Sequence, residues 1–212
     1  FGSTLTLGGS ESASGVLAVT NGTVTFKRPF CLKAGSAVFA DGAQIVLDRA
    51  SRLYGDGASA TLLADGATLR VAADPAYDPL SGFTMATIGA EGLVIDAPDA
   101  VTVSQALVGP GVLTLSGAGK KTLSGDIACA KVVVTGGDVD FTGVVTAEVV
   151  ATDGATVSFG GRSTVENPLA GLTLGGTDVA GVLAVGPGEE IFVTSAPVFG
   201  HLRLALSGWI SG

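Results

Sequence analysis

The chain has 212 residues, of which 33 are glycine, 14 % are charged and 6 % are aromatic, and its formal net charge is −8. An apolar content of 47 % with so modest a charge excludes a disordered chain, and glycines without a three-residue period exclude collagen. Gly, Thr and Val outnumber Glu, Lys and Arg, which argues against a helical bundle. The length predicts one domain or one extended array over residues 1–212.

Basic residues number only 11, and no cluster is larger than the pairs Lys27-Arg28 and Lys120-Lys121. A surface that binds nucleic acid or anionic lipid needs several cations on one face. We therefore expect no nucleic-acid partner. Because no window of 18 uninterrupted apolar residues occurs, we also expect no membrane insertion.

Short segments that alternate polar and apolar residues recur from Thr4 to Leu206, for example at 23–26, 68–71, 138–141 and 156–159. A period of two places alternate side chains on opposite faces of a strand. The tripeptide Asp-Gly-Ala, at 41–43, 56–58, 65–67 and 153–155, precedes such segments. Asp and Gly accept left-handed turn conformations, and the tandem Gly-Gly-x-Gly-x-Asp pattern of calcium-binding repeats is absent. We interpret these tripeptides as turns.

Two stretches depart from this pattern. Val46, Ala50 and Leu53 share helical spacing, which makes 44–54 the one candidate helix, although the strands around it argue against a helix. Residues 73–82 contain Pro75 and Pro79, and we expect them to form a loop that projects from the strands.

The segments at 5–19 and 172–185 share the sequence LTLGG followed by GVLAV, which indicates repeated supersecondary units. A β-sandwich would contain more large core residues. The sequence therefore predicts an all-β protein, a single-stranded parallel β-helix (β-solenoid) with short strands and Gly/Asp turns. Each turn of the solenoid should take roughly 20–25 residues.

The segment 108–125 reads VGPGVLTLSGAGKKTLSG and closely resembles the autotransporter-associated β-strand repeat, in which Gly-x-Gly-x-Leu-Thr-Leu-Ser-Gly precedes a short turn. The resemblance covers residues 92–125. It implies a right-handed parallel β-helix within a large bacterial surface or secreted protein, of which this chain would be a fragment. The family carries no defined catalytic residues that could be transferred to this chain.

Cys31 and Cys129 are flanked by apolar residues, so we expect both to be small core residues; a disulfide between them is the alternative. With one histidine and two distant cysteines, the sequence offers no zinc ligand set. We expect no metal and no cofactor.

The one candidate catalytic pair is Asp138 and Asp140, whose carboxylates should leave the same face of a strand. Two such carboxylates can hydrolyse a glycosidic bond or hold a divalent cation. Arg162 follows about one turn later and could lie beside them. Outward aspartates also keep a solenoid soluble and block strand pairing. His201 has Leu202 on the opposite face, so we expect it to be a solvated surface residue.

Three functions are consistent with these patterns. The first is a non-catalytic, extracellular, adhesin-like module that acts as a stalk or contact surface on a bacterial cell. The second is a carbohydrate-active β-helix enzyme that uses Asp138, Asp140 and Arg162. The third is a self-associating fibre subunit. The expected partners are other copies of the chain, or glycans or proteins outside the cell.

Overall fold

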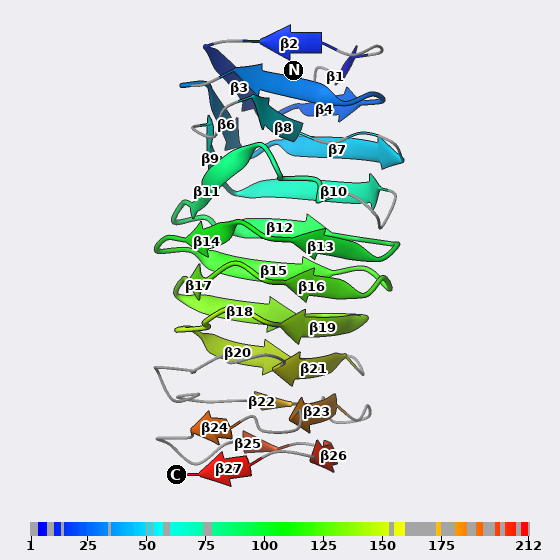
Figure 1. The fold of residues 1–212 in the computed structure, drawn as a ribbon, viewed down its shortest axis with the longest axis vertical. Helices are drawn as coiled ribbons and strands as arrows, with labels where there is room; N and C mark the ends of the chain where they lie inside the picture. Colours follow the sequence, from blue (N-terminus) through cyan, green and yellow to red (C-terminus); the bar gives the residue numbers. More distant parts are fainter. Residues whose placement is uncertain are drawn as a thin grey trace.

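The computed structural model shows a β-solenoid, in which successive strands stack along the long axis of the molecule (Figure 1). The structure describes residues 4–7, 11–13, 15–33, 35–49, 51, 53–56, 60–73, 78–152, 155–159, 173–174, 181–185, 190–192, 198–199, 202–206 and 209–211. These residues contain no helix, and every strand pairing among them is parallel. The prediction of an all-β parallel solenoid is confirmed.

The strands form three sides. The long sheet has ten strands: β1 (Thr4–Leu7), β4 (Thr23–Phe26), β7 (Gln44–Arg49), β10 (Ala67–Ala73), β12 (Leu93–Asp96), β15 (Val112–Ser116), β18 (Lys131–Val134), β20 (Glu148–Ala151), β22 (Thr173–Leu174) and β25 (Val198–Phe199). The β3–β17 sheet has six: β3 (Val16–Thr20), β6 (Ala37–Asp41), β9 (Ala60–Asp65), β11 (Phe83–Ile88), β14 (Ala106–Val108) and β17 (Ile127–Ala128).

The third side is divided. The β13–β26 sheet contains β13 (Val101–Val103), β16 (Lys121–Leu123), β19 (Asp138–Phe141), β21 (Thr156–Phe159), β23 (Gly181–Val185) and β26 (Leu202–Leu206). On the same side near the start of the chain, a separate sheet joins β2 (Glu11–Ala13), β5 (Phe30–Lys33) and β8 (Leu53–Asp56). A two-stranded sheet pairs β24 (Glu190–Phe192) with β27 (Trp209–Ser211); β24 lies between β23 of the third side and β25 of the long sheet, which places this pair on the side of the β3–β17 sheet.

One turn of the solenoid passes once along each side. The consecutive strands β14, β15 and β16, for example, belong to three different sheets, and each pairs with the strand of the same side one turn later. Residues that pair in register on neighbouring turns are 17 to 26 positions apart. This spacing brackets the predicted turn length.

The core consists of inward side chains that stack on one another along the axis. In the long sheet one continuous inward row contains Ile45, Leu69, Ile95, Leu115 and Val134, all buried. Burying each such side chain stabilises the fold by about 1.5–3 kcal/mol before conformational entropy is counted. The core therefore consists mainly of Val, Leu, Ile and Ala, with few aromatic rings in it.

The corner between the β3–β17 sheet and the long sheet uses left-handed backbone. Gly42 and Gly66 have φ of 54° and 57°, and Asn21 takes the same position one turn earlier with φ of 50°. The amide of Gly42 donates to the carbonyl of Asp65 at 2.8 Å, which links successive corners. The Asp-Gly-Ala tripeptides at 41–43 and 65–67 are turns, as predicted; residues 57–58 and 153–154 of the other two copies lie outside the described residues.

The candidate helix at 44–54 is not a helix. Gln44–Arg49 forms β7 in the long sheet, and Leu53–Asp56 forms β8 on the third side. In-register pairing with the neighbouring turns outweighs the local helical spacing.

The described part of the expected loop at 73–82 does not project. Residues 78–82 form a turn against β8, where the amide of Leu53 donates to Pro79 and the amide of Gly82 donates to Leu53, both at 2.9 Å. Leu80 is fully buried in the core. The hydrophobic side chain holds this segment inward, and residues 74–77 lie outside the described residues.

The two cysteines are free thiols in the structure. Cys31 is buried, as expected for a core residue, whereas Cys129 is half-buried and packs against the core from a corner. Burial raises the pKa of the Cys129 thiol.

Candidate functional site

The acidic pair lies on the outer face of β19. Val139 and Phe141 point into the core and are fully buried, while Asp138 is exposed and Asp140 is half-buried. The alternation therefore places both carboxylates on one face, as the sequence indicated. This face belongs to an open sheet on the third side of the rod.

Asp140 is already engaged by its neighbours. The ammonium of Lys120 lies 2.5 Å from one carboxylate oxygen, Oδ2, and the hydroxyl of Ser158 donates to the other, Oδ1. The register explains the second contact, because Asp140 pairs with Ser158 of β21 and with Thr122 of β16. Asp140 thus joins three successive turns through outward polar side chains.

The charges around Lys120 favour its protonated state. The hydrogen bond to Asp140, the charge of Asp140 and the charge of Asp138 all raise the pKa of Lys120 above its ordinary value, against a smaller opposing effect of burial. The side chain of Lys120 is 54 % exposed, so the pair contributes little to stability. The positive charge of Lys120 offsets the negative charge of Asp140, one of the two carboxylates that a hydrolase would use.

Two residues of the sequence-based hypotheses are not placed. Arg162, the expected neighbour of the acidic pair, and His201 both lie outside the described residues. Of the three residues proposed for an enzyme, the structure brings together Asp138 and Asp140 only. In the part of the chain that the structure describes, no group of three or more His, Cys, Asp or Glu side chains could hold a metal ion.

Lys121 is the residue whose environment the sequence analysis missed. Its side chain is fully buried, and its ammonium donates to the carbonyls of Gly117, Gly119 and Gly136 at 2.7, 2.8 and 3.2 Å. Three donors meet three acceptors, so the group is satisfied. Burial nevertheless lowers the pKa of Lys121, although the charges of Asp96 and Asp138 partly offset that effect.

A signal for this burial exists in the sequence. Lys121, Thr122 and Leu123 alternate, which puts Lys121 on the same face as the buried Leu123. The two lysines of the pair therefore point in opposite directions: Lys120 ties the outer face to Asp140, and Lys121 holds two successive corners together from inside.

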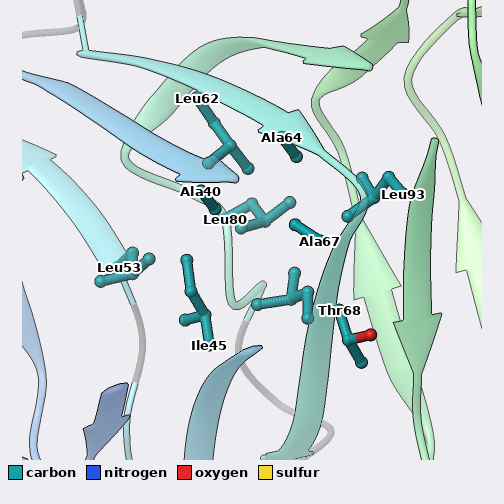
Figure 2. A pocket seen from close by; sticks show the side chains of 10 residues that line it. Ala40, Ile45, Leu53, Leu62, Ala64, Ala67, Thr68, Leu80 and Leu93 are labelled. Atoms are coloured by element: carbon teal, nitrogen blue, oxygen red, sulfur yellow. The ribbon is translucent and has the colours of Figure 1, made fainter. Parts of the chain in front are cut away.

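A small cavity lies inside the solenoid next to the turn at 78–82 (Figure 2). Three alanines and six larger aliphatic residues line it, and Thr68 is the one lining residue with a polar side chain. Its full lining is Ala40, Ile45, Leu53, Leu62, Ala64, Ala67, Thr68, Leu69, Leu80 and Leu93. The cavity offers no titratable group, so we interpret it as imperfect core packing where a turn replaces a strand.

The β3–β17 sheet carries a different kind of surface. Val16, Phe39, Leu63 and Met85 are outward-facing and exposed. We call these four side chains the apolar face. They make up four of the five large exposed hydrophobic residues in the described part of the chain; the fifth, Val112, lies at the start of β15 in the long sheet.

Comparison with known protein families, curated proteins and solved structures finds no match to this chain. The resemblance of residues 92–125 to the autotransporter-associated repeat therefore stays a prediction. Within the described residues there is no helix of a length and apolarity that would cross a membrane.

Proposed function

We propose that this chain is a non-catalytic structural module that acts outside a bacterial cell as a stalk or contact surface. The observation that carries the proposal is the parallel register that continues through the ten strands of the long sheet. Such stacking gives a stiff rod whose outward side chains repeat at about 4.8 Å. The extracellular location rests on the likeness of residues 92–125 to the autotransporter-associated repeat.

The enzyme hypothesis is the second candidate, because Asp138 and Asp140 share one outer face. A retaining or inverting glycosidase needs both carboxyl groups of such a pair, one as the acid and one as the nucleophile or base. Both oxygens of Asp140 are partnered, one by an ammonium and one by a hydroxyl. These contacts favour the structural proposal over catalysis.

The two candidates differ in a direct assay. We expect the full chain to release no reducing ends and no unsaturated sugars from acidic or neutral polysaccharides, and Asp140→Asn to behave identically. Ser158→Ala is the matched control, because it removes the hydroxyl that donates to Asp140 and leaves both carboxylates in place. Cleavage by the native chain that is abolished in Asp140→Asn would overturn the structural proposal and establish the enzyme.

A further inference from the structure

The four residues of the apolar face lie on four successive strands of one sheet, with Phe39 and Leu63 as direct neighbours at its centre. Phe39 pairs with Leu63 in one outward row, while Val16 and Met85 lie in the adjacent row of the same sheet. Their exposed fractions are 68 % for Val16, 40 % for Phe39, 37 % for Leu63 and 39 % for Met85. Together they expose apolar surface on the order of 300 Å², a size at which patches on soluble proteins are often functional.

The outward positions around these four residues are small. Ala18 precedes Phe39 in its row, and Thr87 and Val108 follow Leu63. In the adjacent row Ala37 and the exposed Thr61 separate Val16 from Met85. No Lys, Arg or His occurs in any strand of the β3–β17 sheet. The face is therefore low in relief, apolar and free of positive charge.

Acidic side chains border one edge of this face. Asp41 and Asp65 end their strands and pair with each other in register, and Glu91 follows in the next corner. Asp41 and Glu91 are exposed, while Asp65 is half-buried and accepts the amide of Glu91 at 2.7 Å. A complementary partner would bring apolar side chains to the centre and cations to this edge.

The shape of the face sets the size of that partner. Alternate residues on a strand are about 7 Å apart, and the four strands that carry the apolar face span about 14 Å along the axis. An α-helix is about 10 Å wide, and about 10 residues of helix cover 14 Å. A stable dimer of globular chains buries about 800 Å² on each partner, so one narrow element fits this surface better than a whole domain.

From these observations we infer that the apolar face binds one basic amphipathic helix of a partner protein, with its apolar stripe on Phe39 and Leu63 and its cations beside Asp41. A second copy of this chain fits less well, because its corresponding sheet supplies further acids and no cation. The inference rests on the proposed function, in which the module acts through its surface.

A designed peptide can test the inference. The probe is a fluorescent 18-residue helix with leucines at i, i+3, i+4 and i+7 and lysines along one flank, titrated with the full chain in fluorescence anisotropy. We expect saturable binding that Leu63→Ser and Phe39→Ser each weaken by at least about fivefold. Val112→Ser, an equally exposed apolar residue on another side, is the matched control and should bind like the native chain.

Charge is tested separately. The same peptide with glutamates in place of lysines should bind at least about tenfold more weakly, and Asp41→Asn should weaken the lysine peptide by about two- to threefold. Circular dichroism spectra and urea midpoints establish that each variant is folded. If either Leu63→Ser or Phe39→Ser fails to fold, the other variant provides the test.

Several results would overturn the inference. Failure of the lysine peptide to bind, equal binding by Leu63→Ser and Val112→Ser, or equal binding of both peptides would each do so. Dimers in light scattering that Leu63→Ser abolishes would identify a second copy as the occupant instead. None of these results depends on the polysaccharide assay, so failure here and failure of the proposed function are distinguishable.

Discussion

At the scale of single residues, Lys121 shows how a charged group can be part of a solenoid core. The ammonium replaces three missing backbone donors at the corners around residues 117–119 and 136. Gly119 is buried, so water is excluded from its carbonyl, whereas Gly117 and Gly136 are half-buried. The arrangement stabilises because an unpaired buried carbonyl costs more than the net gain of one hydrogen bond.

Lys121→Met keeps the length of the side chain and removes its donors. We expect the free energy of unfolding to fall by about 1–3 kcal/mol, measured by urea unfolding at neutral pH. Leu123→Met, two residues further along β16 and equally inward, is the control for a change of shape and should cost less than about 1.5 kcal/mol. Equal stability of Lys121→Met and the native chain would contradict the structural role of the ammonium.

The pH dependence of this difference has a definite sign. The pKa of Lys121 is lower in the folded chain than its ordinary value of 10.5, so the unfolded chain holds more protons in the interval just below pH 10.5. The free energy of unfolding that Lys121 contributes therefore rises with pH in that interval. Lys120, whose pKa is raised, is present in both proteins, so its titration does not enter the difference.

We accordingly expect the stability gap between the native chain and Lys121→Met to widen between about pH 8 and pH 10.5. Urea midpoints at both pH values measure it. A gap that narrows would mean that the folded state favours the charged amine.

At the scale of elements, the strands and the turn at 78–82 illustrate which features local sequence reveals and which it does not. The alternating segments 23–26 and 138–141 form strands as predicted, because the pattern of inward and outward residues is local. Two prolines suggested a projecting loop, but the burial of Leu80 depends on β8 one turn earlier, which local sequence does not reveal.

The similar segments 5–19 and 172–185 also show that the position of a strand depends on more than its local sequence. Both copies of Leu-Thr-Leu contribute a strand to the long sheet, β1 and β22. The following Gly-Val-Leu-Ala-Val forms β3 in the β3–β17 sheet but β23 in the β13–β26 sheet. The side on which a segment lies depends on the strands between, here β2, so similar sequences occupy different faces.

Leu80→Ala tests the contribution of this turn. Truncation enlarges an existing apolar cavity, and we expect it to destabilise the chain by about 2–5 kcal/mol in urea or thermal unfolding. Ser81→Ala, exposed and in the same turn, should change stability by less than about 0.5 kcal/mol. A Leu80→Ala variant as stable as Ser81→Ala would show that the turn packs only loosely.

The apolar face could have been found from sequence only in part. Alternation in 37–41 and 60–65 identifies Phe39 and Leu63 as lying on the face opposite the buried alanines. Their meeting in one row depends on a register between residues 24 positions apart, Phe39 and Leu63. The ion pair of Lys120 with Asp140 was missed for the same reason, since it joins two neighbouring turns.

At the scale of the whole molecule, each turn interacts mainly with the turns before and after it. Val112 pairs with Lys131 in the long sheet, and Lys121 pairs with Val139 on the third side. Removal of residues 112–130 would therefore place Leu93 opposite Val132 and Val101 opposite Val139, so that buried apolar residues face each other on both sides.

We expect this deletion variant to fold into a rod one strand spacing shorter, about 4.8 Å. The measurements are a retained β-sheet circular dichroism spectrum and a cooperative urea transition. Deletion of 112–120, which removes part of a turn and shifts every later register, is the control and should not fold. Identical behaviour of the two variants would contradict the turn-by-turn account of stability.

The three-sided cross-section has one more consequence. The outward residues of the three sides differ in chemistry. The β3–β17 sheet carries the apolar face, Asp140 of the β13–β26 sheet pairs with Lys120, and the long sheet carries Arg70 with Asp96. Substitutions on one side can accumulate without altering the chemistry of the other two. One scaffold can thus diverge toward three separate ligands, each acquired independently.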